Sequence, residues 1–149
     1  MRMVLYQPDI PQNAGAILRL GACMGVAVDI VEPCGFALSD ARMRRAGMDY
    51  LDRAALTRHA SWDAYLAARG GGRLILLTTT GATPPAAFRF TLEDNLLLGQ
   101  EGAGVPAEVH AAADARLRIP MREGARSLNV AIAAAMVLAE ALRQTNAFP

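Results

Sequence analysis

The sequence has no lysine and only two cysteines, and the spacing of these cysteines is typical of neither a metal site nor a disulfide scaffold. Cys23 and Cys34 lie eleven positions apart, without a CxxC motif or clustered histidines. This excludes the usual patterns of a zinc site and of a disulfide scaffold, so we expect two buried thiols and no metal. All fifteen basic residues are arginine, a residue that suits phosphate recognition. The abundance of alanine, arginine and glycine is nevertheless more typical of a GC-rich coding bias.

Long hydrophobic runs are also absent. Hydrophobic residues make up 53% of the chain, but charges and turn residues interrupt them before the roughly 20 apolar residues needed to cross a bilayer. The N-terminal segment reaches Pro8 too early for the core of a signal peptide. These absences predict a cytoplasmic protein.

The chain lacks an excess of charge of either sign. Its formal net charge is +1 at pH 7, whereas nucleic-acid-binding domains often have a pI above about 9, so any RNA contact must be local. The best candidate surrounds Arg42 and Arg45, which share one side of a predicted helix at the i, i+3 spacing that can clamp a phosphate. Tyr50 offers an aromatic face for an unpaired base. The alternative is a solvated helix face, which is the commoner role of a charge run.

The apolar pattern predicts an α/β fold. Five short apolar runs are typical of buried strands, at 3–6, 26–31, 74–78, 96–98 and 117–119. The expected helices and their N-terminal residues are 14–24 with Asn13, 41–46 with Ser39 or Asp40, 62–69 with Ser61, a short helix to 112 with Pro106 in its first turn, and 128–144 with Ser127. This alternation predicts a mostly parallel sheet flanked by helices on both faces, in one domain spanning 1–149.

Two loops near the C-terminus predict a ligand site. The loop 99–106 and the segment 120–129 each follow an apolar strand, and ligands of open α/β sheets bind beyond the carboxyl ends of strands. Three glycines in the first loop allow close backbone approach or positive φ, and Glu101 can accept hydrogen bonds from ligand hydroxyls or amines. The alternative is a plain glycine-rich turn. The spacing matches neither GxGxxG nor GxxxxGK[ST], which argues against dinucleotide and P-loop nucleotide sites.

A third stretch, residues 5–15 followed by Arg19, resembles the opening motif of the SPOUT (α/β-knot) RNA methyltransferases. Together with both C-terminal loops and with 31–36 and 44–50, it makes nearly the whole chain similar to the small stand-alone tRNA (cytidine(34)-2'-O)-methyltransferases. The resemblance implies S-adenosylmethionine as cofactor, a tRNA anticodon stem-loop as substrate and a C-terminal trefoil knot, which periodicity and spacing do not show. The alanine-rich final helix permits close approach of a second subunit, and the chain is too short to hold cofactor and anticodon loop alone, so we expect a homodimer.

The resemblance also implies roles for individual residues. Arg19, Asn13 and Asn129 are implied as catalytic residues beside the acceptor ribose. Those implied to bind the cofactor are Leu77, Gly99, Ile119 and Ser127, whereas Arg42, Arg45 and Tyr50 are RNA-binding candidates on the residue pattern given above. Taken alone, Arg19 is more simply a solvated surface arginine. Because arginine stays protonated, we expect it to hold a phosphate and to stabilise oxyanion charge, which leaves the base unassigned.

Two positions depart from the family pattern. Gln100 stands where the family often has proline, and Ala139 stands where it often has tyrosine. Two other functions therefore stay open, namely methylation of another tRNA or rRNA position, and non-catalytic RNA binding by a knotted protein. The retained asparagines and Arg19 argue against the second. A flavodoxin-like binding module is disfavoured because no phosphate-binding loop follows the first strand.

Overall fold

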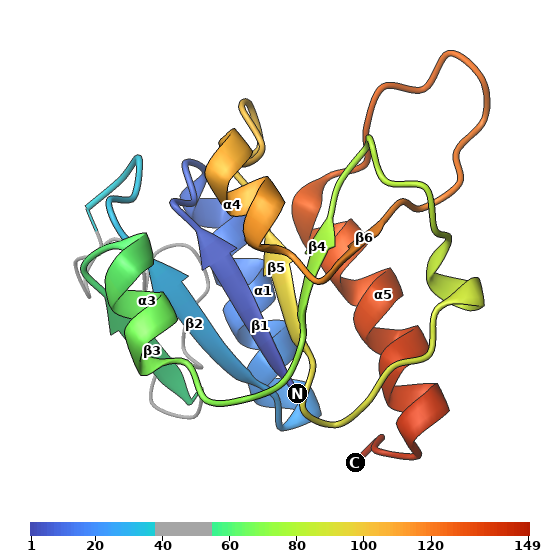
Figure 1. Cartoon of the computed structure of the whole chain (residues 1–149), viewed down its shortest axis with the longest axis horizontal. Helices are drawn as coiled ribbons and strands as arrows, with labels where there is room; N and C mark the ends of the chain where they lie inside the picture. The colour runs from blue at the N-terminus through green and yellow to red at the C-terminus, as the bar shows by residue number, and fades with distance from the viewer. Residues whose placement is uncertain (38–54) are drawn as a thin grey trace.

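The computed structural model describes residues 1–37 and 55–149. These residues form a six-stranded, all-parallel sheet in the order β3-β2-β1-β5-β4-β6 (Figure 1). The strands are β1 (Arg2–Tyr6), β2 (Ala27–Val31), β3 (Leu56–His59), β4 (Leu74–Leu77), β5 (Asn95–Leu98) and β6 (Ala115–Leu117). The helices are α1 (Pro11–Met24), α3 (Trp62–Ala68), α4 (Ala107–Ala112) and α5 (Val130–Thr145), with a 3₁₀ turn η1 (Pro85–Ala87). The predicted α/β class with a mostly parallel sheet is confirmed.

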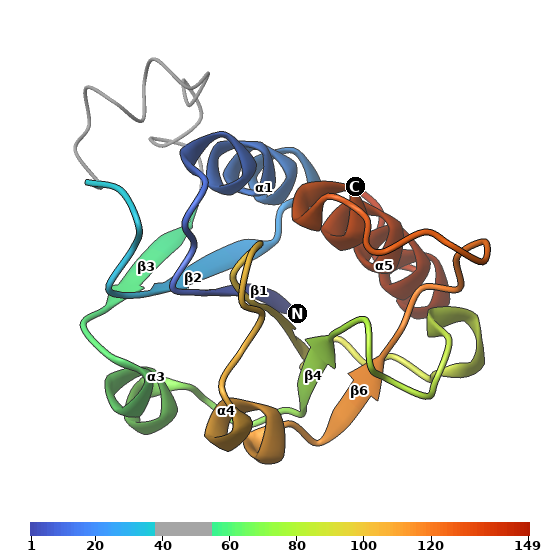
Figure 2. The same cartoon turned by 90° about the horizontal axis from the view of Figure 1, so that it is seen from above.

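Helices cover both faces of the sheet, as expected. Figure 2 shows α1 and α5 on one face and α3 and α4 on the other. Side chains of β1 alternate between these two layers, since Met3 and Leu5 join the core beneath α1 and α5, whereas Val4 and Tyr6 join the core beneath α3 and α4. Because both faces are covered, the central strands are apolar at consecutive positions.

Two differences from the predicted strands have physical causes. β6 spans Ala115–Leu117 and not 117–119, because Arg118 N–H donates to Thr83 O at 3.0 Å instead of continuing the sheet. Ile119 therefore lies in the loop after the strand. The apolar pattern does not predict β3, whose sequence Leu-Thr-Arg-His has one aliphatic residue and leaves its two central side chains exposed.

Polar contacts attach this edge strand to the sheet. Asp29 of β2 is buried, and its Oδ1 lies 2.8 Å from His59 Nε2 of β3. The same oxygen accepts a hydrogen bond from Arg2 Nη2 of β1 at 3.0 Å, and Arg2 Nη2 also donates to Thr57 Oγ1 at 3.4 Å. Burying a carboxylate is costly unless it is paired and hydrogen-bonded. Three neighbouring strands thus share one buried carboxylate, which compensates for the small apolar surface of β3.

The helix ends correct two predicted caps. Ser61 caps α3 as predicted, its Oγ accepting from Ala64 N at 3.1 Å. Asn13 does not cap α1, because the helix begins at Pro11 with Ile10 as N-cap, and proline suits a first helical turn. Ser127 does not cap α5 either.

The N-cap of α5 is Asn129, whose Oδ1 accepts from Ala131 N at 2.9 Å and from Ile132 N at 3.3 Å. Pro106 is the N-cap of α4, one position before the predicted first turn. The predicted helix over 41–46 lies outside the described residues.

The two cysteines differ in burial. Cys34 is half-buried, and burial raises the pKa of its thiol to about 11. Cys23 is exposed, so the expectation of two buried thiols is wrong for this residue. In the described parts of the chain, no helix has the length and apolar content required to cross a membrane.

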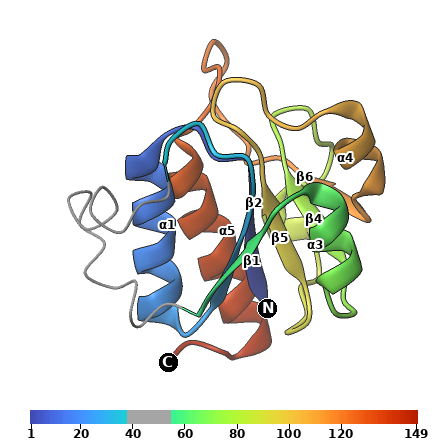
Figure 3. The same cartoon turned by 90° about the vertical axis from the view of Figure 1, so that its left-hand side faces the viewer.

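The carboxyl ends of β4, β5 and β6 meet at one edge of the sheet, where α5 also begins. After β6 the chain forms the segment 118–129, which rises above the strands before α5 runs back along the face that α1 covers (Figure 3). α5 contacts α1 there. The loops after β4, β5 and β6 therefore lie close to the first turns of α1 and α5.

Candidate active site

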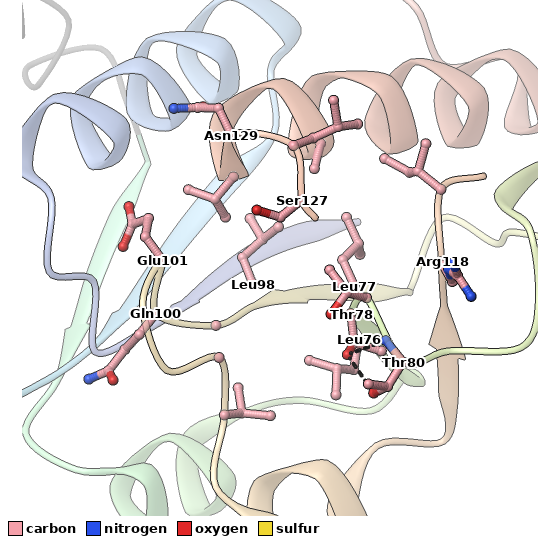
Figure 4. A pocket seen from close by; sticks show the side chains of 18 of the residues that line it. Leu76, Leu77, Thr78, Thr80, Leu98, Gln100, Glu101, Arg118, Ser127 and Asn129 are labelled. Carbon is pink, nitrogen blue, oxygen red and sulfur yellow. Dashed lines mark hydrogen bonds between the residues drawn. The ribbon is translucent and has the colours of Figure 1, made fainter. Parts of the chain in front are cut away.

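A pocket of about 680 Å³ lies beyond the carboxyl ends of β4, β5 and β6. Its walls come from the loops after these strands and from the start of α5, at residues 78–80, 99–105, 118–119, 121 and 126–130. Figure 4 shows Glu101, Ser127 and Asn129 toward one side and Thr78, Thr80 and Arg118 toward the other. The two loops singled out in the sequence do form one pocket, and the loop after β4 adds a third wall.

The loop after β5 is folded tightly on itself. Gln100 N donates to Gly104 O at 2.8 Å, and Gly104 N donates to Gln100 O at 2.9 Å. A Cβ at Gly99 would lie 2.6 Å from the carbonyl carbon of Gly104, and Gly104 itself has φ +68°. Only glycine fits both positions without strain. The turn thus brings bare backbone to the pocket wall, so the loop is both a tight turn and part of a candidate site.

A chain of side-chain amides joins three distant segments at the pocket mouth. Asn129 Nδ2, at the start of α5, donates to Asn13 Oδ1 of α1 at 2.9 Å. Asn13 Nδ2 in turn donates to Glu101 Oε1, in the loop after β5, at 2.9 Å. The structure therefore brings two of the three predicted catalytic residues into direct contact and adds Glu101 to them.

Asp9, in the loop after β1, is paired with Glu101. Glu101 N donates to Asp9 Oδ1 at 3.1 Å, and Asp9 N donates to Glu101 Oε2 at 3.4 Å. Burial raises the pKa of Glu101, and the adjacent Asp9 carboxyl raises it further. Hydrogen bonding to the Glu101 side chain and to backbone amides lowers the pKa of Asp9. Of this pair, Glu101 is the carboxyl that takes up a proton more readily.

All four predicted cofactor-binding residues line the pocket. Leu77 ends β4, Gly99 follows β5, and the other two, Ile119 and Ser127, belong to the segment between β6 and α5. Sequence reasoning did not single out His110 of α4, which also lines the pocket. Arg116 Nε donates to His110 Nδ1 at 3.0 Å. The ring can then present only its other nitrogen to the pocket.

Arg19 is exposed on α1, six residues after Asn13 and roughly 9 Å further along the helix axis at 1.5 Å per residue. It is not among the described residues that line the pocket. The structure thus does not bring this predicted catalytic residue to the pocket of its own chain. Arg42, Arg45 and Tyr50 lie outside the described residues.

A metal centre finds no support in the part of the chain that the structure describes. Among residues 1–37 and 55–149, His, Cys, Asp and Glu form no group of three that could hold a metal ion. The pocket offers glycine backbone, amides and the Glu101 carboxyl. Such groups suit a polar organic ligand of moderate size.

Comparison with known proteins identifies this arrangement. Residues 1–139 match the model of the SpoU rRNA Methylase family, and the chain belongs to that family. A relative from Ancylobacter novellus named tRNA (cytidine(34)-2'-O)-methyltransferase is 57% identical over 99% of this chain and 95% of its own length.

Solved structures agree with the sequence comparison. A structure described as giving insight into the 2-OH methylation of C/U34 on tRNA is 41% identical, with a TM-score of 0.90 over 96% of this chain and 94% of that one. The SpoU methyltransferase AviRb from Streptomyces viridochromogenes, in complex with AdoMet, is 26% identical, with a TM-score of 0.81 over 97% of this chain and 60% of that one.

Proposed function

We propose that this protein is an S-adenosylmethionine-dependent tRNA 2'-O-methyltransferase that acts on nucleotide 34, cytidine or uridine, in the anticodon loop. The observation that carries the proposal is the pocket at the ends of β4, β5 and β6, with the Asn129–Asn13–Glu101 contacts at its mouth. The names of relatives that match nearly the whole chain support the substrate.

The residues present fit the cofactor. A pocket of about 680 Å³ lies within the roughly 300–1,000 Å³ typical of small-molecule sites, and a Cβ at Gly99 would meet the opposite strand of the loop. Leu77, Gly99, Ile119 and Ser127 would hold the cofactor, largely through backbone groups. When bound, it supplies a methyl group on a positively charged sulfonium that needs no further activation as a leaving group. The proposal includes no metal ion.

The two asparagines act by positioning the acceptor ribose. Both polar atoms of the Asn13 amide form hydrogen bonds, since Nδ2 donates to Glu101 and Oδ1 accepts from Asn129. Asn129 is also engaged as the N-cap of α5. Amides held in this way present fixed dipoles to a 2'-hydroxyl and keep its oxygen aligned for in-line attack, which is the main requirement of this reaction.

The homodimer is a further part of the proposal. Ile132 and Met136 lie four residues apart on α5 and are 54% and 49% exposed, and Leu128, just before the helix, is 38% exposed; together we call them the apolar stripe. The stripe begins at the pocket, which Leu128 also lines. A second copy of this chain docked on the stripe would cover it. Arg19 on the neighbouring α1 would then serve the pocket of the partner subunit, where it stabilises developing negative charge.

We also include the C-terminal trefoil knot, within a single domain spanning 1–149. Support comes from the path of the chain after β6, which leaves one edge of the sheet and returns as α5 to contact α1 (Figure 2). Pulling the chain from both ends in a single-molecule experiment tests the knot. A knotted chain should extend to less than the roughly 3.3–3.6 Å per residue of an unknotted one, and full extension would refute it. We also propose a cytoplasmic location, which the proposed tRNA substrate supports.

Mass spectrometry of tRNA nucleosides tests the function directly. The purified protein with S-adenosylmethionine should add one methyl group to the ribose of nucleotide 34 in a tRNA transcript, and an otherwise identical transcript with a 2'-deoxy nucleotide at position 34 should gain none. The name of the SpoU rRNA Methylase family supports a second candidate function, methylation of an rRNA position. Methylation of rRNA fragments together with unmodified tRNA would establish that candidate and refute the first.

A further inference from the structure

Asp9 and Glu101 hold each other by reciprocal contacts that the proposed reaction does not itself require. Each carboxyl accepts the backbone N–H of the other residue, at 3.1 Å for Asp9 Oδ1 and 3.4 Å for Glu101 Oε2. The pair joins the loop after β1 to the loop after β5, two strands that are neighbours in the sheet. Neither carboxyl can move without releasing a hydrogen bond to the other loop.

Asp9 is also held from a third side. A Cβ at Gly35, in the loop after β2, would lie 2.9 Å from both Cα and Cβ of Asp9, and Gly35 N donates to Pro8 O at 2.9 Å. This close backbone approach requires glycine at residue 35. Asp9 thus has a fixed position from which its carboxyl meets Glu101.

Asp9 holds Glu101 at two points in the loop after β5, because its carboxyl accepts from the backbone N–H of Glu101 and its own N–H donates to Glu101 Oε2. That loop closes on itself through the two hydrogen bonds between Gln100 and Gly104, which do not involve Asp9. Glu101 Oε1, by contrast, accepts from Asn13, and Asn13 accepts from Asn129. A displaced Glu101 therefore disturbs the two asparagines while leaving the backbone wall of the pocket in place.

We propose that Asp9 is a positioning residue for methyl transfer, which holds Glu101 against Asn13 and so fixes the amides of Asn13 and Asn129 toward the acceptor ribose. This inference rests on the proposed function. It assigns Asp9 an effect on the rate of transfer and little effect on cofactor affinity, because the backbone wall of the pocket has its own contacts.

The test compares Asp9→Ala with Asp9→Asn, which keeps an acceptor oxygen for Glu101 N. Asp9→Ala should lower the single-turnover methylation rate on the order of tenfold to a hundredfold, the loss that a misplacement of about 1 Å produces. Calorimetry should find the dissociation constant for S-adenosylhomocysteine close to that of the wild type. Asp9→Asn should recover most of the rate. Asp63→Ala, which removes an exposed carboxylate on α3, is the matched control and should change neither quantity.

A second variant displaces Asp9 without removing its carboxyl. Gly35→Ala drives a methyl group against the Asp9 backbone and should give the same loss of rate with retained S-adenosylhomocysteine binding. A wild-type rate in Asp9→Ala would overturn the proposal. So would a parallel loss of rate and cofactor binding, or no recovery in Asp9→Asn.

An arm without chemistry separates this proposal from the proposed function. In the cofactor-free protein, the side-chain amide NMR signals of Asn13 and Asn129 should shift in Asp9→Ala and return toward their wild-type positions in Asp9→Asn. Unchanged signals in Asp9→Ala would refute the positioning role even in an active enzyme. If the wild type leaves nucleotide 34 unmethylated, the proposed function fails, while these signals still decide whether Asp9 orients the two asparagines.

Discussion

Replacing Gly99 by alanine tests whether cofactor binding needs the loop after β5 to close on its own backbone. The new Cβ would lie 2.6 Å from the carbonyl carbon of Gly104 and 2.7 Å from its oxygen. These are backbone atoms clamped by the Gln100–Gly104 hydrogen bonds, so they cannot rotate away. Overpacking of this kind costs about 1–3 kcal/mol. If binding needs the closed loop, the dissociation constant for S-adenosylhomocysteine should rise roughly fivefold to 150-fold, at about 1.4 kcal/mol per tenfold.

Calorimetry on a small set of glycine variants separates this clash from other effects. Gly102→Ala, in the same loop, places its Cβ 3.7 Å from Asp9 Oδ2, an ordinary contact, and should weaken binding far less. Gly104→Ala meets no atom within 4 Å but has φ +68°, which costs about 1–2 kcal/mol in strain alone. Gly99→Val should abolish binding while circular dichroism still reports the fold. Wild-type affinity in Gly99→Ala, or an equal loss in Gly102→Ala, would refute the reasoning.

Three further predictions concern charge and assembly. Arg19→Ala should lower the single-turnover methylation rate on the order of 10²-fold or more, with a much smaller loss of RNA affinity. Arg19→Lys should also have a low rate, because an ammonium group cannot make the two-pronged contact of a guanidinium. Near-normal turnover in Arg19→Ala would show that Arg19 is only a surface residue. Replacing Arg42 and Arg45 together should flatten the salt dependence of RNA binding by up to about two charges, as filter binding at several salt concentrations would measure, with cofactor binding intact; an unchanged slope would contradict phosphate contacts. Light scattering should give about twice the 15.8 kDa mass of one chain. Met136 is exposed in the single chain, and Met136→Arg should shift the protein toward monomer because it would bury a charge in the proposed interface. A fully active wild-type monomer would rule out a site shared between subunits.

The central part of the fold could be predicted because local sequence determines it. In β5 (Asn95–Leu98), for example, residues 96–98 form a continuous apolar run, which marks a strand covered on both faces. β3 could not be found in this way, because its stability comes from the contact of His59 with Asp29 across the sheet and from Arg2 beyond it. Such contacts join residues far apart in sequence and leave no periodic pattern.

In the candidate site, too, local sequence predicted some residues, whereas those that depend on distant contacts could not be predicted. Glycine spacing identified the loop at Gly99, and a motif placed Asn13 and Asn129 in the right region. The cap of α5 could not be assigned correctly, since Ser127 and Asn129 are both good N-cap residues and only the direction of the chain decides between them. The sequence shows Asp9 as an acidic residue soon after the first strand. Its role could not be predicted from this, because it depends on where the loop after β5 lies.

The hydrogen bond between Asn129 and Asn13 spans 116 positions of the chain, which sets a condition on biosynthesis. At about 5–20 residues per second, a ribosome needs roughly 6–23 s to travel from one of these asparagines to the other. During that time β1 and α1 exist as nascent structure, but the amide chain at the pocket mouth lacks its last member. A chain released by premature termination before α5 lacks Asn129 as well as Val137 and Leu138 of the core, so it has no complete site.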